Sequence, residues 1–191
     1  EYAFQVGVDA PAEPFTVHTT VTGYPDTPEN FQSMGVFIGN GDQDNYLKLV
    51  TAANGGTGGV QFAKEVDGTF TNVASPDEPD VTGPANETDL YLTVDPVNET
   101  VEAFYAVNGG PMTKVGETTV PQSWLDSSDG TGLAIGVIST STGSSSTFSA
   151  TWQHLNVEYV TPPANQPPIA DAGADVVVDE RDAVTLDGTD S

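Results

Sequence analysis

Two carboxylates and two amides fall close together in one segment, with the types and spacing of a cation site. Asp42, Asp44 and Asn45 follow one another closely, Asn40 precedes them, and Gly41 permits the chain to curve. Carboxylate, amide and carbonyl oxygens are the ligands that Ca²⁺ takes in proteins. The segment therefore predicts a calcium site in a turn. The alternative is ordinary acidic loop chemistry, in a chain with 28 acidic residues.

A second acidic group lies near the end of the sequence, and its carboxylates are separated by residues typical of turns. It consists of Asp171, Asp175, Asp187 and Asp190. Carboxylates that several turns bring together also suit Ca²⁺. We therefore hypothesise a second calcium ion at a junction between domains. The alternative is that these residues form ordinary acidic turns exposed to solvent.

Residues for catalysis are few. The chain has no cysteine, which excludes thiolate nucleophiles, thiolate zinc sites and disulfides. His18 and His154 both fall within expected strands, and neither has a second histidine nearby in sequence, so both are interpreted as sheet-face residues. The nearest approach to a glycosidase carboxylate pair, at 77–80, is broken by Pro79 and is typical of a loop. The chain is therefore expected not to be an enzyme.

Aromatic side chains provide the direct basis for a sugar-binding hypothesis. An aromatic ring can stack on the apolar face of a pyranose. The candidates are Trp124, Tyr46, Tyr105 and Tyr24, with Trp124 first. Four other aromatic residues are expected in the core instead: Phe4, Phe37, Phe148 and Trp152.

Two segments fit the N-glycosylation sequence Asn-x-Ser/Thr. They begin at Asn86 and Asn98, and both fall in expected turns beside strands. Such short motifs also occur by chance, but secretion would favour their modification.

The charge balance excludes several partners. Four basic and 28 acidic residues give a formal charge of −24. A nucleic-acid partner needs a basic face, and an anionic membrane surface repels an acidic one. No apolar run reaches the length of a membrane span, and no signal peptide opens the sequence, so a soluble segment is expected. An acidic, lysine-poor composition is typical of proteins from multimolar salt, where ions screen the self-repulsion.

Apolar residues alternate with period two along most of the chain, and none of the segments keeps helical spacing for three turns. The sequence therefore predicts an all-β fold, with two antiparallel sheets in a jelly-roll sandwich over residues 1–160. A single helical turn is expected at 121–126. Tight hairpin reversals are expected at Asn40-Gly41, Asp67-Gly68 and Asn108-Gly109. The expected strands are 2–8, 15–21, 33–38, 45–52, 59–66, 69–73, 89–94, 100–107, 112–118, 133–139 and 147–160.

The composition changes after residue 160. Residues 161–168 contain four prolines and predict a stiff, extended linker. Residues 169–191 have the pattern of two short strands, but 23 residues are too few to bury a core, so they are interpreted as the beginning of a second domain.

That tail resembles the opening of a polycystic-kidney-disease-type (PKD) repeat, which is immunoglobulin-like. The matching residues are Pro167, Pro168, Ala170, Ala172, Gly173, Thr185, Leu186, Asp187, Gly188 and Ser191. Asp182 departs from the family pattern, where glycine is usual. The resemblance implies a β-domain that is truncated here.

Residues 1–160 resemble the concanavalin A-like, laminin G-like sandwiches of large secreted proteins from halophilic archaea and some bacteria. The matching segments are 35–48, 102–110, 134–139 and 148–152. The resemblance implies carbohydrate binding or adhesion only loosely, because the fold carries many functions.

Two functions follow as hypotheses. The first is a non-catalytic module at the cell surface that binds carbohydrate or mediates adhesion and is stabilised by calcium. The second is a structural subunit of an extracellular filament or surface layer, in which copies of the protein join through exposed strands. The sequence does not separate them.

Overall fold

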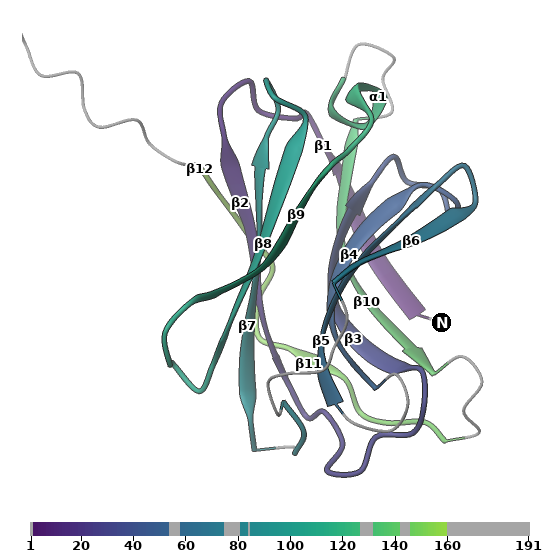
Figure 1. Cartoon of the computed structure of the whole chain (residues 1–191), viewed down its shortest axis with the longest axis vertical. Helices are drawn as coiled ribbons and strands as arrows, with labels where there is room; N and C mark the ends of the chain where they lie inside the picture. Colours follow the sequence, from purple (N-terminus) through teal and green to yellow (C-terminus); the bar gives the residue numbers. More distant parts are fainter. Residues whose placement is uncertain are drawn as a thin grey trace, which may run out of the picture. The chain divides into compact units, whose positions relative to one another are not determined.

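The computed structural model describes residues 2–53, 58–74, 81–83, 85–126, 132–141 and 146–159. Within them the regular structure is β-strand, apart from one helical turn. The strands form two antiparallel sheets that lie face to face (Figure 1). This confirms the expected all-β sandwich.

The first sheet contains both the N-terminal strand and a strand from late in the sequence. Each neighbouring pair in it is antiparallel. Its order is β1 (Tyr2–Val8), β10 (Leu133–Ser141), β3 (Gln32–Gly39), β4 (Tyr46–Ala53), β5 (Gly58–Val66) and β6 (Thr69–Ala74).

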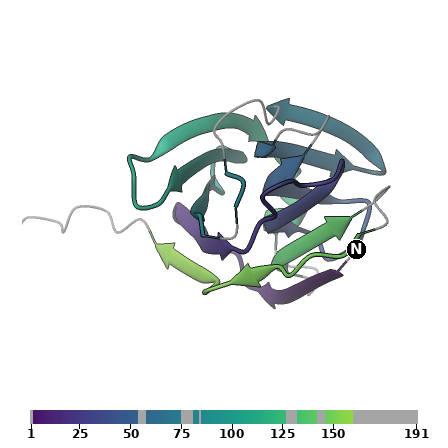
Figure 2. The same cartoon turned by 90° about the horizontal axis from the view of Figure 1, so that it is seen from below.

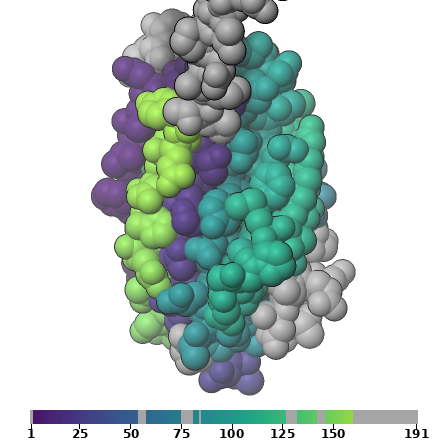
Figure 3. Space-filling model, turned by 90° about the vertical axis from the view of Figure 1, so that its left-hand side faces the viewer, coloured from purple at the N-terminus to yellow at the C-terminus, as the bar shows by residue number. Residues whose placement is uncertain are grey.

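The second sheet is built on β2. One edge of β2 (Phe15–Thr22) pairs with two short strands, β11 (Thr151–Trp152) and β12 (Asn156–Tyr159). Figure 3 shows β12 (yellow-green) running along this side of the molecule. The other edge of β2 continues into β7 (Glu87–Asp95), β8 (Thr100–Val107) and β9 (Thr113–Thr119).

Two of the three predicted tight turns have the expected backbone. Asp67 and Gly68 have φ values of 49° and 72°, and Asn108 and Gly109 have 52° and 68°. Positive φ at both central residues is the type I′ geometry that suits the twist of a hairpin. The prediction of a tight reversal at Asn40-Gly41 is wrong. A longer loop over 40–45 connects β3 and β4.

The prediction of one long strand at 147–160 is also wrong. The segment forms β11 and β12 with an irregular stretch between them. In that stretch the His154 carbonyl accepts a hydrogen bond from the Thr19 hydroxyl at 2.6 Å. The backbone amide of Gln153 donates to the Thr20 carbonyl. These contacts with β2 interrupt the regular ladder.

The core lies between the two sheets, and alternation along the strands fills it. Leu47 and Leu49 from the first sheet meet Leu90 and Leu92 from the second, and all four are buried. Burial of each such side chain stabilises the fold by about 1.5–3 kcal/mol. The predicted helical turn is α1 (Gln122–Leu125), which adds Trp124 and Leu125 to the core.

The predicted linker at 161–168 and the PKD-like segment at 169–191 lie outside the described residues. None of the helices in the described part of the chain is long and apolar enough to cross a membrane.

Candidate ligand-binding site

A second apolar cluster lies on the outer face of the first sheet, away from the core. Phe37 stands between Val36 and Ile38, which belong to the core, and alternate residues of a strand point to opposite faces. Phe37 therefore points outward. It packs with Val50, Ala52 and Ile138, and Tyr46 packs against the group.

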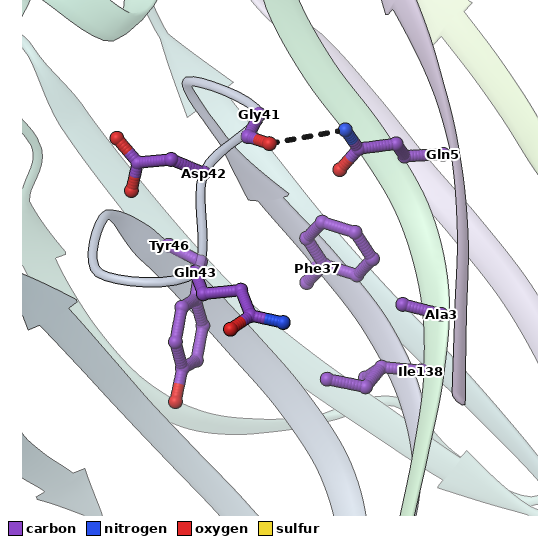
Figure 4. A pocket seen from close by; sticks show the side chains of 8 residues that line it. All are labelled: Ala3, Gln5, Phe37, Gly41, Asp42, Gln43, Tyr46 and Ile138. Atoms are coloured by element: carbon purple, nitrogen blue, oxygen red, sulfur yellow. Dashed lines mark hydrogen bonds between the residues drawn. The ribbon is translucent and has the colours of Figure 1, made fainter. Parts of the chain in front are cut away.

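A cavity of about 300 Å³ opens beside this cluster, between the 40–45 loop and β1. Its volume is at the low end of small-molecule sites. The apolar part of its lining comes from Ala3, Phe37 and Ile138, and the rest from Gln5, Gly41, Asp42, Gln43 and Tyr46. In Figure 4 the Gln43 side chain and the Phe37 ring lie between the loop and β1, while the Asp42 carboxylate turns away from Phe37. The cavity thus combines aromatic rings with neutral amides.

The carboxylate of Asp42 holds the loop in shape. It accepts hydrogen bonds from the Asp44 amide at 2.9 Å, from the Asn45 side chain at 3.2 Å and from the Asn40 side chain at 3.0 Å. Partial desolvation raises the pKa of Asp42, but the hydrogen bonds from Asn40, Asn45 and Asp44 outweigh it and hold the pKa below its ordinary value. The ionised side chain is therefore the organiser of the loop.

Further contacts fix the loop against its surroundings. The Asp67 amide donates to the Asn45 side-chain oxygen at 3.0 Å, and the Gly68 amide donates to the Asp44 carbonyl at 3.0 Å, which tie the loop to the turn between β5 and β6. On the other side, Gln5 Nε2 donates to the Gly41 carbonyl at 3.2 Å (Figure 4). The cavity walls are therefore held without a ligand.

Tyr46 is held in place at the start of β4. Its hydroxyl donates to Glu65 Oε2 at 3.0 Å on the neighbouring strand, and Lys48 Nζ lies 6.0 Å from the ring centroid. The ring is half-buried, so part of it remains accessible. By contrast, Gln43 is exposed, and its amide has no hydrogen-bond partner within the described residues.

Two of the predicted stacking residues are wrong. Trp124 and Tyr24 are each only 2 % exposed, because both pack in the core, and the Tyr24 hydroxyl donates to the Gln32 carbonyl at 2.8 Å. Neither ring presents a face to a ligand. Tyr105 is half-buried on β8 and packs partly against the core, away from the cavity. Only Tyr46 among the four lines this site.

The structure places the calcium-site candidates as expected, in one loop, but gives their oxygens protein partners. Asp42, Asn40 and Asn45 are engaged with each other and with nearby backbone. Within the described ranges, no group of three or more His, Cys, Asp or Glu residues is arranged to hold a metal. Calcium at this turn stays a prediction. The second candidate group, Asp171, Asp175, Asp187 and Asp190, lies outside the described residues.

The two glycosylation sequences differ in accessibility. Asn98 is exposed, in the turn between β7 and β8, and its side chain donates to Asp95 Oδ2 at 2.7 Å. Asn86 is half-buried, and its amide donates to the Thr82 carbonyl and accepts from Asn108. Asn98 is the better placed of the two for modification.

Sequence reasoning missed a histidine pair on the second sheet. His18 Nδ1 lies 3.2 Å from His154 Nε2, and His18 Nε2 lies 3.3 Å from Asp89 Oδ1. The His18 ring stacks on Tyr91, with centroids 4.2 Å apart. The two histidines are 136 positions apart, and the return of the chain along β2 brings them together. The pairing of β2 with β7 brings Asp89 and Tyr91 to His18. No local spacing could have shown this.

No protein-family model matches the chain, and no curated protein matches it. Among solved structures, a GH43 protein mutant from Bacillus licheniformis is similar over 77 % of this chain and 28 % of its own, with 14 % identity and a TM-score of 0.63. GH43B of a xyloglucan PUL from Bacteroides ovatus is similar over 82 % and 29 %, with 16 % identity and a TM-score of 0.63. A functionally unknown protein from Saccharomyces cerevisiae is similar over 84 % and 74 %, with 12 % identity and a TM-score of 0.57.

The chain spans less than a third of the length of the two GH43 proteins. At these identities the likeness concerns the fold alone. It supports the two-sheet antiparallel β-sandwich that the sequence predicts, and it assigns the chain to no family.

Proposed function

We propose that the sandwich is a non-catalytic carbohydrate-binding module of a secreted or cell-surface protein from a high-salt environment, and that it binds its ligand in the cavity beside the 40–45 loop. The observation that carries the proposal is the lining of this cavity. It places the Tyr46 and Phe37 rings next to the neutral amides of Gln5 and Gln43. Sugars present apolar C–H faces and hydroxyl groups, and this combination suits both.

The charge of the chain narrows the class of ligand. The formal charge of −24 disfavours sulfated or uronic-acid polymers wherever salt leaves it unscreened, whereas neutral glycans meet no such barrier. The described lining residues include no lysine or arginine that could neutralise an acidic sugar. A neutral polysaccharide is therefore the proposed ligand.

The lining of the cavity also favours binding over chemistry. Its single ionisable carboxylate, on Asp42, is committed to the loop by its hydrogen bonds. A glycosidase of the usual kind needs two carboxylates on either side of the scissile bond. This supports the proposal of a module without catalytic activity.

Affinity electrophoresis in gels containing neutral polysaccharides tests the proposal. Xyloglucan and xylan are the first probes, because similar structures include GH43 proteins, with an α-glucan and an acidic polymer as comparisons. We expect a neutral polymer to retard the native chain and Tyr46→Ala to abolish most of the retardation. Tyr159→Ala is the matched control, because it removes an exposed tyrosine from β12, far along the chain from the cavity lining. No retardation by any polymer, or equal loss in both variants, would reject the proposal.

A further inference from the structure

The N-terminal strand β1 exposes a row of large apolar side chains. Tyr2, Phe4 and Val6 are 80 %, 63 % and 43 % exposed. The prediction that Phe4 belongs to the core is therefore wrong. These residues lie opposite Ser139, Val137 and Ile135 of β10, so they do point to the inner side of the first sheet. Their exposure means that the described residues of the second sheet leave them largely uncovered.

Figure 2 shows β1 (purple) lying along one edge of the sandwich. A crevice opens beside β1. Its volume is about 290 Å³, and Tyr2 and Phe4 of β1 form one wall. Phe148, Ala150 and Trp152, which precede or belong to β11, form the other. A partly apolar crevice is thus open to solvent beside an edge strand.

The backbone of β1 is also open to a partner. Its only partner among the described strands is β10. The amide and carbonyl groups along its other edge are therefore not paired with any of these strands. Native proteins protect such edges with charged residues, prolines or bulges. From Tyr2 to Val8 the strand contains no charged residue and no proline, and its register with β10 is continuous.

The other edges of the two sheets differ from this one. β9 carries Lys114 and Glu117, β12 carries Glu158, and β11, which has no charged residue, is only two residues long. β6 has no charged residue, but it lies against β9 on the closed side of the sandwich. Within the described residues, β1 is therefore the long edge strand that lacks charge and borders an open crevice.

We propose that β1 pairs antiparallel with β1 of a second copy of this chain, about a two-fold axis at Gln5. This pairing sets Tyr2 opposite Val8 of the partner, and Phe4 opposite Val6 of the partner. Directly opposed residues of an antiparallel pair share a face, so the apolar row continues across the axis. The two first sheets then form one sheet, with the partner's apolar row facing the crevice.

The absence of charged residues on β1 favours a second copy as the occupant. Any association of two chains with −24 charges each is opposed by repulsion, and the repulsion is smallest where carboxylates are absent from the contact. The self-pairing of β1 brings no charged residues of the two strands opposite each other. A basic partner, in contrast, would gain nothing from this strand and would favour the acidic surface elsewhere.

The pairing also places two ligand cavities on one face. Ala3 and Gln5 of β1 line the cavity on the outer face of the first sheet, and the two Gln5 side chains meet at the axis. The inference does not rest on the carbohydrate proposal, because it concerns the strand edge alone.

The first experiment measures the mass of the chain, without an N-terminal tag, by light scattering after gel filtration in about 2 M KCl, where charge is screened. We expect twice the monomer mass of 19.9 kDa. Phe4→Lys should halve this mass, because it places an inward-pointing charge in the row. Phe70→Lys is the matched control, since Phe70 is 50 % exposed on the opposite edge strand of the same sheet and the charge change is equal. It should leave the dimer intact.

The second experiment tests the register with single cysteines, which is simple because the chain contains none. Opposed residues in an antiparallel pair have Cα atoms about 4.5–5.5 Å apart, within the range of a disulfide. Gln5→Cys should therefore form a covalent dimer under mild oxidation. Ala3→Cys should not, because four residues along a strand separate the two cysteines by about 13 Å.

A monomeric native chain in both low and high salt would overturn the proposal. So would a dimer that Phe4→Lys leaves intact, or one that Phe70→Lys disrupts equally, since either result assigns the contact to another surface or to a general effect. A covalent dimer through Ala3→Cys in place of Gln5→Cys would overturn the register. Thermal melts of each variant show whether a lost dimer reflects a lost fold. None of these readouts involves sugar binding.

Discussion

At the scale of single residues, Asp42 shows how a short acidic segment becomes a defined loop. Its two carboxylate oxygens accept hydrogen bonds from the side chains of Asn40 and Asn45 and from the backbone of Asp44. Only the ionised form can accept all of them, which is why its folded-state pKa is low. The loop that borders the candidate ligand cavity is therefore linked to a protonation equilibrium.

Acid is expected to weaken the fold through this residue. Because the folded-state pKa of Asp42 lies below the ordinary value of 3.8, its contribution to stability is fully present above that value. The contribution is lost as the pH falls through the folded-state pKa. Asp42→Asn should lower the melting temperature near neutral pH and make the loss of stability between about pH 6 and pH 2.5 shallower than in the native chain. Parallel curves for the two proteins would contradict this role.

Calcium at the same loop is a separate expectation. A bound ion would take oxygens of Asp42 and Asp44, and it would stabilise the folded state by mass action. We expect a higher melting temperature in millimolar CaCl₂ than in chelator, with KCl held at about 2 M to suppress screening effects. The response should disappear in Asp42→Ala combined with Asp44→Ala. If the double variant responds as the native chain does, the ion is not at this loop.

At the scale of elements, period-two alternation predicted most strands closely because half of each strand faces a core. The strand at 100–107 has the predicted bounds, and the helical turn at α1 was also expected. Alternation indicates which way a side chain points. It does not indicate how far the opposite sheet extends, and for that reason Phe4 was misplaced.

The site was predicted less well, for a related reason. The 40–45 segment was recognised from local composition, and Tyr46 follows it directly. The other lining residues come from β1, β3 and β10, and only the pairing of these strands brings them to the loop. Trp124 is the first candidate for stacking on a sugar because of its aromatic ring, but α1 directs it into the core.

Close strand packing explains one glycine in the first sheet. A Cβ atom at Gly35 would lie 2.7 Å from Val50 Cα and closer still to the Leu49 carbonyl oxygen, both in the backbone of β4. Gly35→Ala should therefore force β3 and β4 apart and lower the free energy of unfolding by about 1–3 kcal/mol. Gly116→Ala, in β9, is the control, because its Cβ would make only ordinary contacts of 3.4 Å or more. Chemical denaturation measures the free energy of unfolding of both variants, and equal values for the two would refute the explanation.

At the scale of the whole molecule, charge dominates. The chain has only four basic residues. One of them, Lys114, makes ion pairs with both Glu102 and Glu117, and these two carboxylates raise the pKa of the lysine. Four basic residues are too few to neutralise 28 acidic ones, so repulsion opposes folding at low salt.

Salt should therefore stabilise the protein. The screening length is about 10 Å at 0.1 M salt and about 3 Å at 1 M. We expect the melting temperature to rise from about 0.1 M to about 2 M KCl, and the same rise to occur in Asp42→Asn, because the effect belongs to the whole surface. A melting temperature that stays constant or falls over this range of salt would contradict the proposed high-salt environment.

The placement of the two tryptophans gives the molecule its own optical reporter. Trp124 is buried in the core, whereas Trp152 lies in the wall of the crevice beside β1, with Nε1 donating to the Gly35 carbonyl at 3.0 Å. Emission from an indole depends on the polarity of its surroundings, so a strand that covers the crevice would shift the Trp152 spectrum to shorter wavelength and leave Trp124 unchanged. A Trp124→Phe variant would isolate that signal and allow the crevice to be followed in real time without any label.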